Sequence, residues 1–131
     1  MQIVVFKLGN EYFAVETERV QSINDMMGIT RVPKAPSYIK GLINLRGSIK
    51  SLVDINLLLN VDSSAKQNNI IILTVKEEEI GISVDEVDEV LDIEEKDIQR
   101  LDENNGPDYV KGIVDYNDKL LTIINIDKLL N

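Results

Sequence analysis

Few residues in this sequence could carry out acid–base or nucleophilic chemistry. It contains no His and no Cys, which excludes Ser-His-Asp and Cys-His nucleophilic sites, and zinc sites built on imidazole or thiolate. Disulfides are excluded as well. An enzyme would therefore require a pair of carboxylates in a pocket.

Asp54 and Asp85 are the candidates for such a pair, because both stand near motif ends. Asp54 also precedes a short apolar stretch, residues 55–59, whose first N–H groups its side chain can cap. The acidic run from Asp85 to Glu95 lacks the spacing and the glycine of an EF-hand loop. We expect no catalytic residue, no metal site and no cofactor. A small carboxylate-dependent enzyme is kept as the alternative of a different class.

The charge balance argues against a nucleic-acid partner. Fourteen Lys and Arg oppose 23 Asp and Glu, the net charge is −9, and there are no Trp, four Tyr and two Phe. This composition disfavours a basic groove with stacking aromatics. An RNA-binding small barrel is therefore disfavoured, and absence of retention on heparin would exclude it.

No segment of the chain has the features of a targeting or membrane segment. Residues 1–7 lack a basic n-region, and no apolar run approaches the ~20 residues of a membrane span. We predict a cytoplasmic protein without membrane insertion. At 131 residues the chain is long enough for one domain with a real core.

Residue usage favours a mostly β fold. Eighteen Ile and 13 Val stand against three Ala, and β-branched residues suit pleated, half-buried surfaces. Turn signals in the first half predict hairpins over 3–15 and 41–53, with a short apolar segment at 29–32 that Pro33 ends. Asp54 is the expected cap of a short helix over 55–59.

The second half shows the same alternation of elements. Residues 69–75 form a continuous apolar run that predicts a strand buried on both faces, and 80–84 is its return strand. The spacing of Val87, Val90 and Leu91 predicts a short helix over 85–91. A last hairpin is expected over 109–124, and Asn125 is the expected cap of a helix over 126–130.

The chain repeats itself internally. A shift of 71 residues places 38–60 on 109–131 with seven identities, and a shift of 67 places 13–15 on 80–82. We predict one domain over 1–131, made of two units that divide near 61–69: a first small barrel over about 1–65 and a second over about 66–131, with exchange of end strands as an option. Such small units should share an interface and unfold together.

One turn distinguishes the copies. The first copy has Asn44-Leu45-Arg46-Gly47 where the second has Asp115-Tyr116-Asn117-Asp118, so Arg46 has no counterpart. Charge divides in the same way, with +2 over residues 1–60 and −11 over 61–131. Residues 31–50 contain five basic side chains and no acid, a potential that would attract an acidic protein surface. An ordinary exposed turn or solvated face is the competing interpretation.

These motifs resemble a known family. Residues 38–47 (YIKGLINLRG) with 52–55 (LVDI), residues 81–87 (GISVDEV) and residues 6–9 (FKLG) resemble the signature of the CheW family of bacterial chemotaxis coupling proteins. The likeness covers essentially the whole chain. It implies two five-stranded, SH3-like β-barrel subdomains with short helices, related by a pseudo-twofold axis.

The resemblance implies a non-enzymatic adaptor. Its implied partners are the cytoplasmic tips of methyl-accepting chemotaxis receptors and the regulatory domain of the histidine kinase CheA, with self-association into rings as a further implied property. The Arg of the NLRG motif, here Arg46, lies near the receptor-facing groove in the family. The partner-binding residues expected from the resemblance and the basic strip are Asn44, Arg46, Gly47, Ser22, Ile23, Val32, Pro33, Lys34, Lys40, Val84 and Val87.

Two positions depart from the family pattern. Many members have Glu where this chain has Ser22, so the expected acidic partner of the Arg is missing. The usual Pro after the hairpin turn is replaced by Ser51. A drifted paralogue that scaffolds another two-component complex is therefore a second hypothesis.

Overall fold

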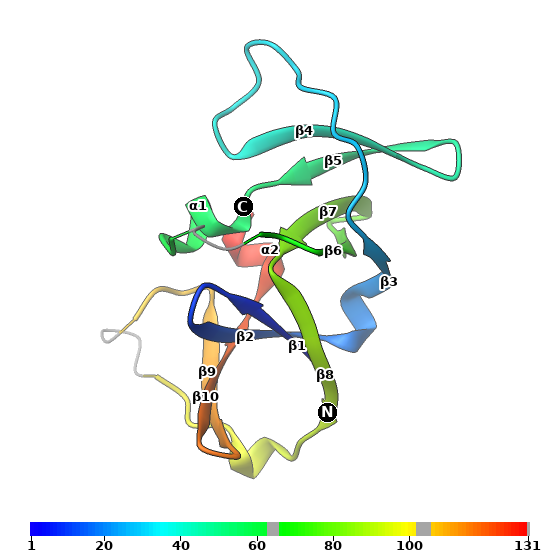
Figure 1. Cartoon of the computed structure of the whole chain (residues 1–131). Coiled ribbons are helices and arrows are strands. Elements are labelled where there is room, and N and C mark those ends of the chain that lie inside the picture. Colours follow the sequence, from blue (N-terminus) through cyan, green and yellow to red (C-terminus); the bar gives the residue numbers. More distant parts are fainter. Residues whose placement is uncertain (63–65, 102–105, 131) are drawn as a thin grey trace.

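The computed structural model describes residues 1–62, 66–101 and 106–130 and is dominated by strands (Figure 1). The mostly β prediction is confirmed. The elements in chain order are β1 (Gln2–Leu8), β2 (Glu11–Glu16), the 3-10 turn η1 (Thr17–Arg19), β3 (Val20–Asp25), β4 (Ile39–Leu45), β5 (Ser48–Val53), α1 (Ile55–Leu59), β6 (Asn69–Val75), β7 (Glu78–Val84), β8 (Glu86–Asp92), η2 (Glu95–Asp97), β9 (Val110–Tyr116), β10 (Lys119–Ile124) and α2 (Ile126–Leu129).

The strands form two five-stranded sheets, one in the lower and one in the upper half of Figure 1. Sheet A has the order β8-β1-β2-β10-β9, and sheet B has the order β3-β6-β7-β5-β4. The four predicted hairpins are all present. Within the described residues no helix is long and apolar enough to cross a membrane.

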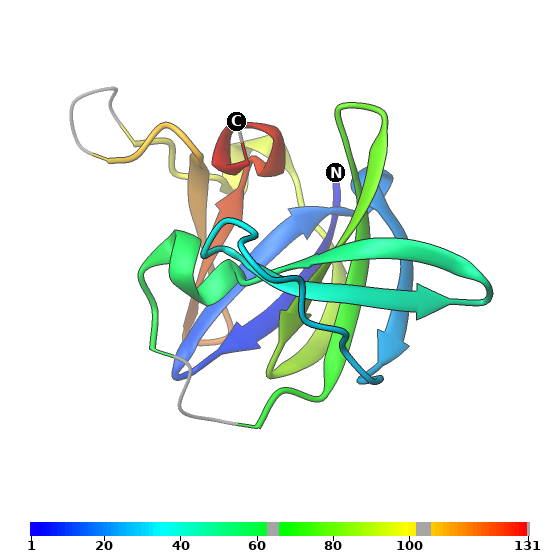
Figure 2. The ribbon, with the colours of Figure 1, turned by 90° about the horizontal axis from the view of Figure 1, so that it is seen from above.

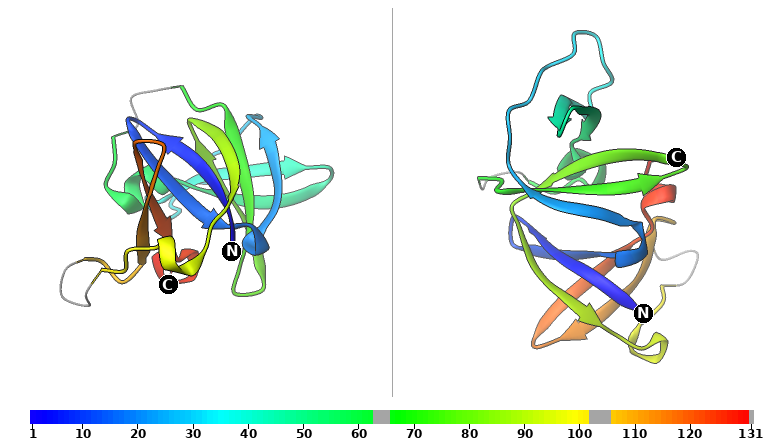
Figure 3. Two further views of the ribbon diagram at one scale, coloured as in Figure 1. Left: turned by 90° about the horizontal axis from the view of Figure 1, so that it is seen from below. Right: turned by 90° about the vertical axis from the view of Figure 1, so that its right-hand side faces the viewer.

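The internal repeat is visible in the element boundaries. A shift of 67 residues carries β1 onto β6, and a shift of 71 carries β4 onto β9 and β5 onto β10, residue for residue. Each sheet combines the first hairpin of one unit with the third strand and second hairpin of the other. The two units thus exchange their first hairpins, and neither sheet is built from one half of the chain (Figure 3).

The exchanged hairpins join the sheets through equivalent parallel pairings. Phe13 of β2 pairs with Thr122 of β10, and the repeat-related Ile80 of β7 pairs with Ser51 of β5. Sheet B closes through paired N–H and C=O groups of Thr30 and Leu42, at 2.8 and 2.9 Å. Sheet A closes through a matching bridge between Gln99 and Ile113.

The first hairpins are buried on both faces because they lie between two apolar clusters. Along β1, Ile3 and Val5 face a cluster inside sheet A, whereas Val4, Phe6 and Leu8 face the core between the sheets. Alternation of side chains along a strand sends them to opposite faces. The central core draws on both sheets and both helices, so we expect the two units to unfold together.

Both short helices begin at the predicted caps. Asp54 accepts a hydrogen bond from the Leu57 N–H at 3.2 Å, and Asn125 accepts one from the Lys128 N–H at 3.3 Å. These equivalent caps satisfy donors that the first turn leaves unpaired.

The predicted helix over 85–91 is wrong, because Glu86–Asp92 is strand β8. It pairs antiparallel with β1, from Gln2 with Asp92 to Lys7 with Glu86. Without β8, the outer edge of β1 would leave its backbone groups unpaired. Tertiary pairing therefore overrode a local spacing that suited a helix. The apolar segment 29–32 also forms no strand, and only Thr30 pairs.

Candidate partner-binding surface

The tip of the β4–β5 hairpin carries the motif that distinguishes the two units. It projects from the end of the molecule opposite to α1 and α2 (Figures 1 and 2). Arg46 and Gly47 both have positive φ, 54° and 86°, as two-residue hairpin turns of type I′ require. The Asn44 side-chain Oδ1 accepts the Gly47 N–H at 2.8 Å. Asn44, Arg46 and Gly47 are exposed, so the structure brings these three predicted residues together.

Arg46 occupies a backbone conformation that suits other residues better. At the equivalent turn of the second unit, Asn117 and Asp118 have φ of 49° and 64°. Asn, Asp and Gly tolerate this left-handed region, whereas a long side chain raises the energy of the turn. In the described part of the chain Arg46 makes no ion pair that would offset the strain. Strained residues of this kind cluster at functional sites; Lys76 and Glu77, in the turn between β6 and β7, also have positive φ, 49° and 69°.

The loop before β4 forms a concave, cationic surface. A cavity of about 430 Å³ is lined by Arg31, Val32, Pro33, Lys34, Ala35, Pro36, Ser37, Ile39 and Lys40. The predicted residues Val32, Pro33 and Lys34 are exposed there. Lys40 is half-buried and donates to Gln67 Oε1 at 2.5 Å and Ser83 Oγ at 2.9 Å.

Three cations of residues 31–50 are available to a partner. Lys50 is paired with Glu79 at 3.1 Å, and Lys40 is held by its neutral acceptors. Arg31, Lys34 and Arg46 make no ion pair with any residue that the structure describes. The cationic surface is defined below as these three residues.

The remaining predicted contact residues lie elsewhere. Ser22 and Ile23 are on β3, at the opposite edge of sheet B; Ile23 is 42% exposed, and Ser22 Oγ accepts from Asn24 Nδ2 at 2.9 Å. Val84 is 0% exposed and belongs to the central core, and Val87 packs against it. We therefore exclude Val84 from the surface, because an inward position on a strand buried on both faces cannot reach a partner.

The two candidate carboxylates of an enzyme have local structural roles. Asp54 caps α1, and Asp85 Oδ2 accepts the Gly9 N–H at 2.7 Å. Asp85 is nearly fully buried at the crossing from β7 to β8, and its Oδ1 has no hydrogen-bond partner among residues 1–62, 66–101 and 106–130. Among the residues described, no group of three or more carboxylates could hold a metal ion.

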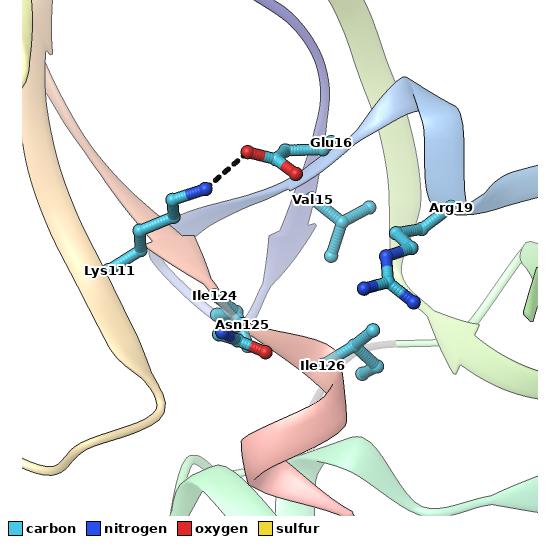
Figure 4. Close-up of a pocket in the computed structure, with 7 residues that line it drawn as sticks. All are labelled: Val15, Glu16, Arg19, Lys111, Ile124, Asn125 and Ile126. Atoms are coloured by element: carbon cyan, nitrogen blue, oxygen red, sulfur yellow. Dashed lines mark hydrogen bonds and ion pairs between the residues drawn. The ribbon is translucent and has the colours of Figure 1, made fainter. Parts of the chain in front are cut away.

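One polar site was missed from the sequence because its residues come from four separate elements. At the end of β2, Glu16 accepts from the Lys111 Nζ of β9 at 2.5 Å, and Arg19 of η1 forms a two-pronged ion pair with Asp127 of α2 at 2.5 and 3.3 Å. Glu16, Lys111 and Arg19 line a cavity of about 100 Å³ (Figure 4). The paired residues are 95 and 108 positions apart in the sequence, so no local sequence pattern predicts these ion pairs.

Acid should weaken the Glu16–Lys111 pair. The hydrogen bond from Lys111 holds the pKa of the Glu16 carboxyl below its ordinary 4.5, against the opposing effect of burial. Because the folded-state pKa is the lower one, the pair stabilises the fold above pH 4.5 and loses this effect as pH falls through the folded-state pKa. We expect the stability difference between wild type and Glu16→Gln, measured by urea unfolding, to shrink between about pH 6 and about pH 3.

The exposed Glu11, also on β2, provides the control for this pH dependence. A Glu11→Gln variant should differ from wild type by a small amount that does not follow the same pH profile. A pH-independent effect of Glu16→Gln would contradict the stabilising role of the charged pair.

Comparison with known proteins gives consistent matches over the whole chain. A family model described as a CheW-like domain matches residues 2–131. The chain is 29% identical over 136 residues to a chemotaxis protein CheW of Helicobacter pylori (99% of this chain, 81% of the relative), and 30% identical over 135 residues to one of Bacillus subtilis (99% and 86%). The crystal structure of scaffolding protein TtCheW from Thermoanaerobacter tengcongensis matches with a TM-score of 0.89 at 30% identity, covering 99% of this chain and 87% of that chain.

Proposed function

The chain belongs to the CheW family of chemotaxis scaffolding proteins, and from this premise we propose that it couples chemoreceptors to the histidine kinase CheA. It is a non-enzymatic scaffold. The proposed partners are the cytoplasmic tips of methyl-accepting receptors and the kinase regulatory domain, and the proposed location is the cytoplasm, at receptor arrays.

We propose that the β4–β5 tip, Asn44 to Gly47, is the receptor-facing element. The observation that carries this assignment is the strained, exposed Arg46, which the second unit replaces with an Asn suited to the turn. The turn would be more stable with that Asn, so the fold does not explain the Arg. A guanidinium presents five donors in a planar fork, which suits recognition of carboxylates and carbonyl groups. Ser22, Ile23, Val32 and Pro33 are proposed contacts outside the tip.

The cationic surface, Arg31, Lys34 and Arg46, is proposed to attract an acidic partner. Association rates with the kinase regulatory domain should fall about tenfold as salt rises from about 50 mM to about 500 mM, because salt screens exposed charges. Stopped-flow mixing would measure these rates. Lys34→Gln should flatten the salt dependence. The exposed Lys128 of α2 is the matched control, and Lys128→Gln should leave the dependence of the association rate on salt unchanged. Association rates that do not depend on salt would show that the cationic surface does not attract the partner.

We propose that the single domain arose from two copies of one unit that exchange their first hairpins. The residue-for-residue match of β4–β5 with β9–β10 and the equivalent parallel pairings support this origin. Only the first copy carries the arginine turn. On this proposal, the duplicated unit supplies the scaffold, and the two copies present different surfaces.

A pull-down of full-length protein with the native kinase and with receptor cytoplasmic fragments tests the coupling function. Capture of both, and of both together, is the expected result. The departures at Ser22 and Ser51 favour one alternative, a paralogue that scaffolds a different two-component complex. Capture of a histidine kinase without chemotaxis receptors would support that alternative, and failure to bind either partner would refute the coupling role.

A further inference from the structure

The side-chain amide of Gln67 is surrounded by polar groups of sheet B and α1. Its Oε1 accepts from Lys40 Nζ at 2.5 Å. Its Nε2 donates to Asn56 Oδ1 at 2.9 Å and to the Ser83 main-chain O at 3.3 Å. One neutral carboxamide thus satisfies a half-buried lysine on β4, an amide on α1 and a carbonyl at the end of β7.

The internal repeat places a second set of these groups elsewhere in the molecule. The shift of 71 carries Lys40 onto Lys111 and Asn56 onto Asp127, and the shift of 67 carries Ser83 onto Glu16. Two of these counterparts, Glu16 and Lys111, line the small cavity in Figure 4. The third, Asp127, pairs with Arg19, which also lines the cavity. Its lining residues are Val15, Glu16, Arg19, Lys111, Ile124, Asn125 and Ile126.

Among the described residues, no carboxamide side chain hydrogen-bonds to Lys111, Glu16 or Asp127 in the way that Gln67 bonds to their counterparts. Two ion pairs hold its equivalent partners instead: Glu16 accepts from Lys111, and Arg19 donates to Asp127. Figure 4 shows Lys111 and Glu16 on one side and Arg19 on the other. The cavity that Glu16, Lys111 and Arg19 line has a volume of about 100 Å³, several times what one ordered water needs.

We propose that this cavity is a binding site for a carboxamide group, such as the end of a glutamine or asparagine side chain. Lys111 uses one of its three donors on Glu16 and has others for the ligand oxygen. The ligand NH₂ group can donate to a Glu16 carboxylate oxygen. Val15, Ile124 and Ile126 supply an apolar wall for the attached methylene groups.

The charge balance selects a neutral ligand. Glu16, Asp127, Lys111 and Arg19 sum to zero and are already paired. A carboxylate or ammonium would bring an uncompensated charge to a half-buried site, which carries a desolvation penalty. A carboxamide offers one acceptor and two donors and leaves both ion pairs intact.

NMR titration of the ¹⁵N-labelled full-length protein with propionamide tests the site. We expect saturable shifts at Glu16, Lys111 and Asn125, with a dissociation constant of about 10 mM, as suits a ligand with so few atoms. Propionate and propylammonium should bind at least about tenfold more weakly, and Lys111→Met should weaken propionamide binding by a similar factor. Equal binding of all three probes, or no saturation with propionamide, would overturn the proposal.

The Gln67→Ala variant serves as an internal reference, because it vacates the equivalent position. Propionamide should then produce a second set of shifts, at Lys40, Asn56 and Ser83, and should raise the thermal midpoint of this variant more than that of wild type. If only the vacated site binds, the repeat-related cavity is not a carboxamide site. If both sites bind propionamide, titration with N-acetylglutamine amide distinguishes two natural ligands. Shifts at Glu16, Lys111 and Asn125 with this compound indicate a glutamine side chain of a protein, and binding of propionamide alone indicates a free small amide.

Discussion

Replacing Gly41 with alanine is expected to destabilise the protein by about 3 kcal/mol. A Cβ at this position would lie 2.4 Å from the Thr30 carbonyl oxygen and 2.7 Å from Ile29 Cγ2. Thr30 is the residue that closes sheet B against Leu42. Because the obstacle is backbone, relief requires the closing bridge to open. Urea or thermal unfolding of the full-length protein measures the loss.

The chain contains both a second test and a control. Gly112, the repeat-related residue, would place a Cβ 2.4 Å from Ile98 Cγ2 and 3.0 Å from the Gln99 carbonyl oxygen, so Gly112→Ala should show a similar loss at the closure of sheet A. An added Cβ at Gly28 would have no atom of a non-neighbouring residue within 4 Å in the part of the chain that the structure describes. Gly28→Ala should therefore change stability by less than about 0.5 kcal/mol. Equal stability of the Gly41 and Gly28 variants would show that closure does not depend on this glycine.

Replacing Arg46 with asparagine is expected to weaken receptor binding by about 30-fold, the effect of losing an interface hot spot of about 2 kcal/mol. The same variant should be at least as stable as wild type, because Asn tolerates the φ of 54° that Arg46 adopts. Titration calorimetry with a receptor cytoplasmic fragment gives the affinity, and urea unfolding gives the stability. A loss of binding without a loss of stability separates a contact residue from a folding residue.

Two further variants sharpen this test. Arg46→Lys keeps the charge but loses the planar fork, so a partial loss of binding indicates that guanidinium geometry matters. Asn117→Arg places an arginine in the equivalent turn of the second unit, where it should strain the turn and leave receptor binding unchanged. Normal binding by Arg46→Asn, or a clear drop in its stability, would assign Arg46 to the hairpin alone.

Local signals in the sequence predicted most of the elements. The type of turn residues, the apolar runs and the capping Asp54 and Asn125 each act within a few residues, and the hairpins and both helices agree with the structure. The comparison of the two copies also identified Arg46 as the residue without a counterpart. The spacing of Val87 and Val90 was misleading, because residues three apart share a helix face but lie on opposite faces of a strand. In β8, Val87 packs against the central core and Val90 is 50% exposed.

Burial and long-range polar contacts could not be predicted in this way. Val84 was expected on a contact surface, but the exchanged hairpin places it inside the central core. Lys111 and Glu16 are 95 residues apart in the sequence, and Lys40 is satisfied by Gln67 from the segment that joins the units. The burial of Val84 and these polar contacts depend on how entire hairpins pack against one another, which no local sequence pattern specifies.

The sequence by itself determined the strands, the turns, the helix caps and the existence of two related copies, since each depends on short-range conformational preferences or direct self-comparison. Only the tertiary structure decided which hairpin joins which sheet. A hairpin that is apolar on both faces could pair with the remaining strands of either unit. Which unit it joins depends on side-chain packing and backbone hydrogen bonds over the whole core. The packing of the hairpins exposes Arg46 at the β4–β5 tip. It also brings Glu16 and Lys111 together at the small cavity, at the position related by the repeat to the site of Gln67.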